Sequence, residues 1–198
     1  MKIIGLTGGI ASGKTTVAGY LSAKHHLLVI DADYISHQLF VRSQIQNQII
    51  QTFNSFDILD QAGVIDRRKL SQLIFSDLKL KSQLESILHP LIISQIKTQI
   101  HNHKERGTAT KIILSAPLLI ETELADFCDE IIVLDLRPEL QFKRLLARQP
   151  DLIPLETKQI IAAQTPASVR NKYATHLLLN NSTLAHLFSQ VDQIMSLS

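Results

Sequence analysis

Residues 8–15 read Gly8-Gly9-Ile10-Ala11-Ser12-Gly13-Lys14-Thr15 and match the pattern G-x-x-x-x-G-K-[ST]. The match lies between an apolar, strand-like run at 2–7 and a helical pattern that begins at Thr16. Glycines let backbone amides turn inward as an anion nest, and the N-terminus of the following helix adds partial positive charge. Residues 8–16 therefore predict a nucleotide-phosphate site, in which Lys14 reaches the β- and γ-phosphates and the Thr15 hydroxyl ligates Mg²⁺. The alternative is a glycine-rich turn with a solvated lysine.

Short apolar runs alternate with longer helical patterns over the rest of the chain. The candidate strands are 2–7, 27–31, 111–116, 130–136 and 176–179. This alternation predicts an α/β protein of the P-loop nucleoside-triphosphate hydrolase fold, with a five-stranded parallel sheet and helices on both faces. Strand-to-helix crossovers are right-handed and bring functional loops to the carboxyl ends of the strands.

The length of 198 residues predicts a single kinase domain over 1–198 that carries elaborations. Between 34 and 106 no strand is evident, and apolar residues recur at helical spacing, which predicts a helical insertion. Within it His89-Pro90 predicts a kink or break, because proline removes a helical hydrogen bond. The segment 138–170 is expected to form a lid, whose two helices are separated by a mobile polar connection at 149–154.

Charge and cysteine content restrict the class of partner. The net charge of +2 comes from 20 basic and 18 acidic residues without a block of one sign, so neither a nucleic-acid nor a membrane partner is expected. Cys128, the one cysteine, fits a reducing compartment and a small half-buried side chain. With no signal-peptide pattern and no apolar run near the ~20 residues that span a bilayer, we expect a cytoplasmic protein, a monomer or weak homo-oligomer.

Two carboxylates follow the second predicted strand, in Val29-Ile30-Asp31-Ala32-Asp33. Their spacing of two places both side chains on one side of an extended chain. A carboxylate at this position could accept the proton of an attacking hydroxyl or hold the water shell of Mg²⁺. The alternative is an aspartate that caps the helix starting near Tyr34.

Taken together, these segments resemble the dephospho-coenzyme A kinase family, and the resemblance extends over the whole chain. Five features carry it: Gly5–Ile10 with the phosphate loop, Ile30–Asp33, Gly63–Leu70 running to Phe75, Leu84–Pro90 and Pro117–Glu121. Weaker similarities occur at Gln141–Arg144, Arg148, Gln164 and Asn180.

The resemblance implies transfer of the γ-phosphoryl group of ATP to the 3′-hydroxyl of dephospho-coenzyme A. The family's catalytic base falls on Asp33, and Asp31 becomes a supporting carboxylate. The helical insertion resembles the coenzyme A-binding domain, so that Arg67 and His89 are candidates for binding the acceptor. Arg67 could instead be a solvated residue at a helix start, and His89 a histidine buried beside a proline kink.

Further site residues follow from the same resemblance. Pro117 and Leu118 would form a wall after the third strand, with Glu121 near the acceptor or, alternatively, capping the next helix. Arg144 and Arg148 lie four residues apart on one helical face, where they could close over the phosphates and stabilise the transition state, or form surface salt bridges.

Some residues depart from the family pattern. Ala11 replaces a usual glycine, and we expect it to be tolerated with a negative φ. Ser115-Ala116 stands where many relatives are acidic. Asn180 would lie near the adenine or start a turn, although His176 and Asn181-Ser182 depart from the pattern there.

Two other classes of function remain open. One is another P-loop kinase acting on a nucleoside, a nucleotide or a sugar-like acid. The other is an ATP-dependent conformational switch. A guanine-specific switch would need N-K-x-D, and Asn171-Lys172-Tyr173-Ala174 lacks the aspartate.

Overall fold

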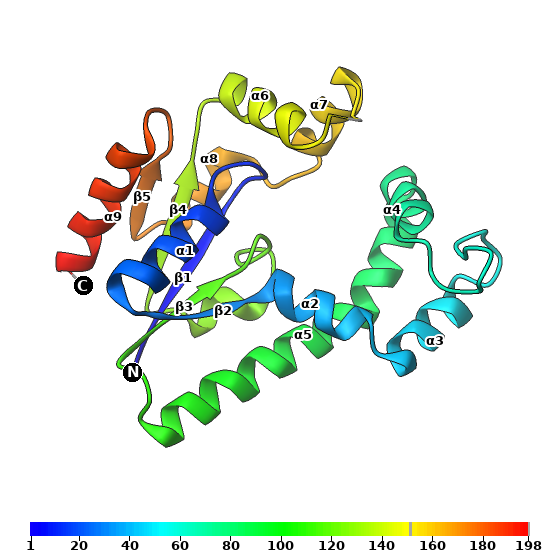
Figure 1. The fold of residues 1–198 in the computed structure, drawn as a ribbon, viewed down its shortest axis with the longest axis horizontal. Helices are drawn as coiled ribbons and strands as arrows, with labels where there is room; N and C mark the ends of the chain where they lie inside the picture. The colour runs from blue at the N-terminus through cyan, green and yellow to red at the C-terminus, as the bar shows by residue number, and fades with distance from the viewer. Residues whose placement is uncertain (151, 198) are drawn as a thin grey trace. The chain divides into compact units, whose positions relative to one another are not determined.

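The computed structural model contains a five-stranded sheet in the order β2-β3-β1-β4-β5, with every neighbouring pair parallel (Figure 1). The structure describes residues 1–150 and 152–197, without the side chain of Phe75. The strands are β1 (Lys2–Gly8), β2 (Leu28–Asp31), β3 (Lys111–Ser115), β4 (Glu130–Asp135) and β5 (His176–Leu179). The predicted strands agree with these bounds to within one residue, and the predicted fold class is confirmed.

The chain divides into two compact units, Met1–Asp31 with His103–Ser198, called the sheet unit, and Ala32–Asn102, called the helical unit. The α-helices are α1 (Lys14–His25), α2 (Ala32–Phe40), α3 (Ser43–Thr52), α4 (Arg67–Ser76), α5 (Leu78–Arg106), α6 (Pro138–Arg148), α7 (Pro154–Ala162), α8 (Ala167–Arg170) and α9 (Leu184–Leu197). Two 3₁₀ helices are η1 (Glu123–Phe127) and η2 (Asn171–Tyr173). No helix in the described parts of the chain is both long and apolar enough to cross a bilayer.

One face of the sheet packs against α1 and α9, which contact each other (Figure 1). The Tyr20 ring stacks on Phe188 at 4.0 Å between centroids, and its hydroxyl donates to Asp192 at 2.9 Å. Hydrogen bonds from His25 and then from Tyr20 lower the pKa of the Asp192 carboxyl. These contacts join the first and last helices of the chain across the apolar core.

The opposite face of the sheet contacts the segment after β3. A Cβ atom on Gly5 would lie 2.6 Å from a methyl group of Leu119 and 2.8 Å from the Cys128 sulfur. Burial, reinforced by the Asp129 carboxylate, raises the pKa of the Cys128 thiol to about 12. The thiol therefore stays protonated at neutral pH, and the expected packing role of Cys128 is confirmed.

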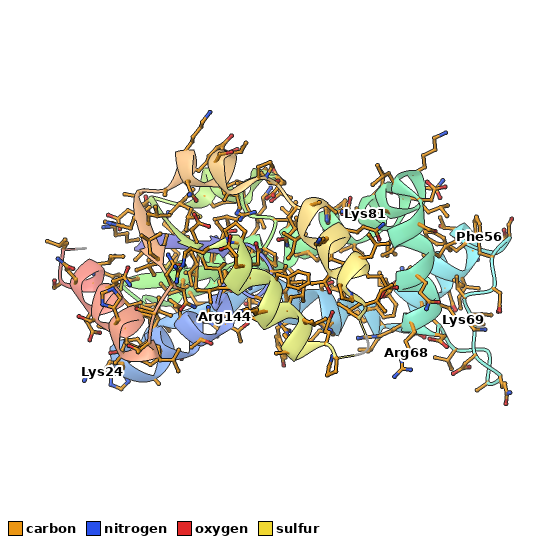
Figure 2. The ribbon with its side chains drawn as sticks, turned by 90° about the horizontal axis from the view of Figure 1, so that it is seen from above. Lys24, Phe56, Arg68, Lys69, Lys81 and Arg144 are labelled. Carbon is orange, nitrogen blue, oxygen red and sulfur yellow. The ribbon has the colours of Figure 1, made fainter. Side chains whose placement is uncertain are left out.

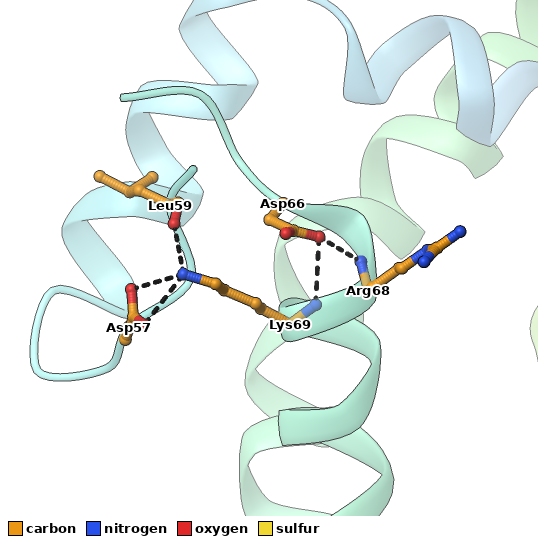
Figure 3. A network of polar contacts seen from close by, with 5 residues as sticks. All are labelled: Asp57, Leu59, Asp66, Arg68 and Lys69. Carbon is orange, nitrogen blue, oxygen red and sulfur yellow. Dashed lines mark hydrogen bonds and ion pairs between the residues drawn. The ribbon is translucent and has the colours of Figure 1, made fainter. Parts of the chain in front are cut away.

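The helical unit has its own apolar core, in which Ile49, Phe53 and Ile58 are buried. The segment at 63–70 forms a turn followed by the start of α4. Gly63 lies in the turn with φ 75°. The Asp66 carboxylate accepts hydrogen bonds from the backbone amides of Arg68 and Lys69, at 2.8 and 3.3 Å. The Lys69 ammonium donates to Asp57 and to the Leu59 carbonyl (Figure 3). Asp66 is therefore the N-cap that starts α4.

The predicted interruption at His89-Pro90 is wrong as a break, because α5 continues through Pro90 to Arg106. The helix is buried on both sides of the proline, at Ile87 and Ile96, so packing offsets the lost hydrogen bond. The chain does break at Asp77, between α4 and α5.

The two helices predicted for the lid segment are present, because α6 ends at Arg148 and α7 begins at Pro154. The predicted connection at 149–154 includes Asp151, which lies outside the described residues. Its mobility stays a prediction.

Candidate active site

The phosphate loop connects β1 to α1, as the sequence predicts. The loop closes through a hydrogen bond from the Ser12 amide to the Gly9 carbonyl at 3.1 Å. Gly13 precedes α1 with φ 99°, and a Cβ atom there would lie 2.6 Å from the Asn180 side-chain nitrogen. Conformation and space both require glycine at this position, from which α1 directs its N-terminus toward the loop.

Ala11 has φ 60°, so the expected negative φ is wrong. The backbone must reverse sharply between Gly9 and Gly13, and this reversal places residue 11 in the left-handed region. That conformation costs an L-residue other than glycine about 1–2 kcal/mol.

The strain at Ala11 predicts the effect of a substitution. Ala11→Gly relieves the strain but adds about 0.5–1 kcal/mol of backbone entropy to be lost on folding. We expect a net stabilisation of about 0.5–1 kcal/mol, measured as a higher urea midpoint. Ala23→Gly, at an exposed position inside α1, is the matched control and should destabilise by about 1 kcal/mol. A lower midpoint for Ala11→Gly would contradict the assignment of strain.

A chain of polar contacts leads from the loop to the second strand. The Lys14 side chain is buried, and its ammonium donates to the Ser115 hydroxyl at 3.1 Å. That hydroxyl donates to the Asp31 carboxylate at 3.3 Å. The register of β2 and β3 pairs Asp31 with Ser115, which accounts for the contact. Ser115, recognised in the sequence only as a departure, therefore bridges the lysine and the carboxylate.

Three side-chain amides hold the backbone of the loop. The Ile10 amide donates to Gln164 Oε1, and Gln141 Nε2 donates to the Ile10 carbonyl, both at 3.0 Å. Asn180 Nδ2 donates to the Ser12 carbonyl at 2.8 Å. In the sequence the two glutamines appear only as family similarities without a role, and Asn180 is expected near the adenine. The structure shows that the Asn180 side-chain amide donates to the loop itself.

The lid arginines lie toward the end of α6. Arg144, labelled in Figure 2, donates from Nη2 to Asn180 Oδ1 at 3.4 Å, so that a residue of the predicted lid contacts the side chain that holds the loop. Arg148 is exposed in the last turn of α6. Their action on the phosphates stays a prediction.

Arg170, at the end of α8, was not selected from the sequence. It is only 6% exposed, and its Nη1 donates to the Thr165 carbonyl. Burial lowers the pKa of its guanidinium, while the carboxylates of Asp135 and Glu121 oppose that shift. No local signal in the sequence marks this arginine, because its burial arises from packing between distant segments.

The turn after β3 contains the predicted wall. Thr7 Oγ1 donates to the Pro117 carbonyl at 3.2 Å, and Leu118 is exposed. Glu121 is also exposed, and the alternative that it caps the next helix is wrong, because Thr122 is the N-cap of η1. The 3₁₀ helix begins after Glu121, so its first amides face the threonine hydroxyl.

Three of the predicted acceptor residues, Asp33, Arg67 and His89, lie in the helical unit. Asp33 is exposed in the first turn of α2, and its carbonyl accepts from His37 Nδ1 at 2.8 Å. A carboxylate is favourable at this end of a helix, so its position fits both the catalytic and the capping interpretation. His89 is half-buried in α5.

A pocket of about 170 Å³ opens within the helical unit. Its lining comprises Ser36, His37, Phe40, Arg67, Leu70, Ser71, Ile74, Leu84 and Leu88. The Arg67 guanidinium lies over the Phe40 ring, 4.6 Å from its centroid. Arg67 thus presents a cation at an apolar pocket, and it is also an exposed residue at the start of α4, so both interpretations of Arg67 stay open.

Oxygen ligands for Mg²⁺ are available near the loop. Thr15 exposes its hydroxyl in the first turn of α1, and Asp31 ends β2. Among the described residues no three or more His, Cys, Asp or Glu side chains cluster as metal ligands. Hard oxygen donors suit Mg²⁺, which keeps several waters and binds substrate phosphates with one or two protein ligands. The residues present therefore fit a magnesium–nucleotide complex.

Comparisons with known proteins identify relatives of the whole chain. The family model described as dephospho-CoA kinase matches residues 2–186. The dephospho-CoA kinase of Fusobacterium nucleatum is 40% identical over 194 residues, which cover 98% of this chain and 96% of the relative. A solved structure from Thermus thermophilus superposes with a TM-score of 0.81 at 27% identity, covering 98% of this chain and 96% of its own. The dephospho-CoA kinase structure from Campylobacter jejuni shares the fold, with a TM-score of 0.71 at 22% identity and coverage of 99% and 96%.

Proposed function

The chain belongs to the dephospho-coenzyme A kinase family, and from this membership we propose how its residues transfer the γ-phosphoryl group of ATP to the 3′-hydroxyl of dephospho-coenzyme A. The protein phosphorylates dephospho-coenzyme A in coenzyme A biosynthesis, and its fold is that of ATP-using P-loop kinases. The observation that carries the proposal is the phosphate loop before α1, with Lys14, Ser115 and Asp31 in one hydrogen-bonded chain.

The loop receives the triphosphate. Its backbone amides and the N-terminus of α1 bind the phosphate oxygens, and the Lys14 ammonium exchanges its bond to Ser115 for the β- and γ-phosphates. Thr15 and Asp31 would hold Mg²⁺, which when bound neutralises phosphate charge as the phosphoryl group is transferred. The Ser115 hydroxyl keeps its hydrogen bond to Asp31 and so keeps the carboxylate oriented.

Asp33 acts as the general base. Its carboxylate takes the proton from the 3′-hydroxyl while that oxygen forms a bond to the γ-phosphorus of ATP. The bond between the γ-phosphorus and the bridging oxygen breaks, and ADP leaves with the electron pair. The products are coenzyme A, ADP and the proton held by Asp33, which passes to water.

The helical unit binds the acceptor in this proposal. The pocket beside Phe40 offers apolar walls, and Arg67 offers a cation for an acceptor phosphate. Contacts of His89, Pro117, Leu118 and Glu121 with the acceptor rest on the family resemblance. Arg144 and Arg148 would close over the phosphates and exclude water.

Both substrates are small cytoplasmic molecules, so we place the protein in the cytoplasm, as a monomer or weak homo-oligomer.

An acceptor assay tests the function. With ATP and Mg²⁺, dephospho-coenzyme A should give stoichiometric ADP release and an acceptor heavier by one phosphoryl group, detected by mass spectrometry. Shikimate, a nucleoside and a nucleotide serve as alternative acceptors. Faster turnover with one of these would indicate another P-loop kinase, and ADP release that needs no acceptor would indicate a conformational switch.

A further inference from the structure

Three polar side chains meet on one side of Gly9 in the phosphate loop. A Cβ atom on Gly9 would lie 2.8 Å from Gln141 Nε2, 2.9 Å from Arg170 Nη2 and 3.3 Å from Gln164 Oε1. The φ of Gly9 is not positive, so space, and not conformation, requires the glycine. Gln141, Gln164 and Arg170 are called the loop clamp below.

The loop clamp comes from both ends of the lid segment. Gln141 lies on α6, and Gln164 and Arg170 follow α7. The two glutamines satisfy the amide and the carbonyl of Ile10, which no helix or strand pairs. The loop backbone is therefore connected to the segments on either side of Arg144 and Arg148, so the shape of the loop depends on them.

Arg170 is the buried cation of the clamp. Its Nε has no hydrogen-bond partner among the described residues, although the side chain is only 6% exposed. A buried guanidinium with an unsatisfied N–H is unfavourable unless an anion compensates for it. Asp135 and Glu121 act on it electrostatically, but neither carboxylate forms an ion pair with it within the described residues. Positive charge therefore remains directly behind the loop.

A bound nucleotide would supply the compensating anion. The triphosphate brings several negative charges to the loop amides, and in a water-poor interior a cation behind those amides interacts with them more strongly than in bulk water. Because Nη2 would lie 2.9 Å from a Cβ atom on Gly9, the charge is next to the backbone whose amides would bind the phosphates.

We propose that Arg170 is a positioning residue for the nucleotide: together with Gln141 and Gln164 it holds the Gly9–Ile10 turn in the shape that binds the phosphates, and its charge favours their binding. It acts through the loop and does not touch the reacting atoms. The inference rests on the proposed function only in that the ligand is a nucleotide, and it is independent of which acceptor is used.

Nucleotide affinity of the full-length protein tests the inference. Arg170→Met should weaken ADP binding, measured by calorimetry without acceptor, by about 10–100-fold, the range of a hydrogen bond to a charged group. Arg170→Lys keeps the charge but loses the planar guanidinium group, so its ADP affinity should lie between those of Arg170→Met and the native protein. The KM for ATP should rise in parallel, and the KM for dephospho-coenzyme A should stay within about twofold, because the hydrogen bonds of the clamp go to Ile10 of the loop and to Thr165, neither of which is an expected acceptor residue.

Lys172→Met is the matched control, because it removes an exposed cation two residues away on η2, and its ADP affinity should stay within about twofold. Native ADP affinity in Arg170→Met, with only a lower melting temperature, would overturn the inference and leave Arg170 a structural residue. If Arg170→Met does not fold, the ADP affinities of Arg170→Lys and Gln164→Leu test the inference instead. Weaker ADP binding in both variants supports the role of the clamp, and native ADP affinity in either variant overturns it. Since ADP binding needs no acceptor, failure of the dephospho-coenzyme A assay does not affect this result.

Discussion

The Asp33→Asn variant should transfer phosphoryl groups at least ~10²-fold more slowly than the native protein, while its affinity for ADP stays unchanged. An amide has nearly the volume of a carboxylate but cannot accept the proton of the acceptor hydroxyl. Asp33 is exposed, so the exchange should alter folding little. The measurements are kcat with both substrates saturating and ADP affinity by calorimetry.

Asp57→Asn provides the control for Asp33→Asn. Asp57 is also an aspartate of the helical unit, but its 83% exposed side chain binds Lys69 at 2.9 Å (Figure 3). Loss of this surface ion pair should leave kcat within about twofold. Near-native turnover of Asp33→Asn would remove Asp33 from the mechanism and direct attention to Asp31, the other carboxylate at the end of β2.

Lys14→Ala is expected to lower kcat by about 10²–10³-fold, the effect of losing one pre-organised donor to transition-state charge. The ammonium is buried, and its bond to Ser115 holds it beside the loop before nucleotide binds. Because we propose that this ammonium contacts the phosphoryl group being transferred, kcat should fall more than ADP affinity does. Single-turnover assays at saturating ATP measure the chemical step directly.

Lys24→Ala is the matched control for Lys14→Ala. Lys24 lies on the same helix, in its last turn and exposed to solvent (Figure 2). Its replacement changes the charge of α1 equally but should leave kcat within about twofold, because exposed charges are screened. Activity of Lys14→Ala equal to that of Lys24→Ala would show that the loop does not bind the transferred phosphoryl group as proposed.

The sheet and the phosphate loop were predictable because their signals are local. Each strand is a short apolar run, and a buried parallel strand requires such a run. The loop is a contiguous pattern in which every residue type has its own geometric or chemical reason. Asp66 likewise starts α4 through a cap that involves only its immediate neighbours.

The surrounding structure overrode the usual local preference at two places: the predicted break at Pro90 and the predicted negative φ of Ala11 are both wrong, while a kink at Pro90 stays a prediction. A proline ordinarily interrupts a helix, yet α5 continues through Pro90 with buried residues on both sides. An alanine ordinarily avoids positive φ, yet Ala11 adopts it because the loop must reverse there. In both places the surrounding structure outweighs a cost of a few kcal/mol at one residue.

By itself the sequence determined the order of the strands and helices, the nucleotide-phosphate loop and the carboxylates that follow β2. Only the tertiary structure decided that Ser115 bridges Lys14 and Asp31, that Asn180 holds the loop backbone, and that Arg170 is buried behind it. Periodicity and turn chemistry act between residues that are neighbours in the sequence. These contacts instead join segments more than 80 residues apart, as does the bond between Gln141 and Ile10, which are separated by 131 residues. Their formation depends on how the whole sheet and its helices pack.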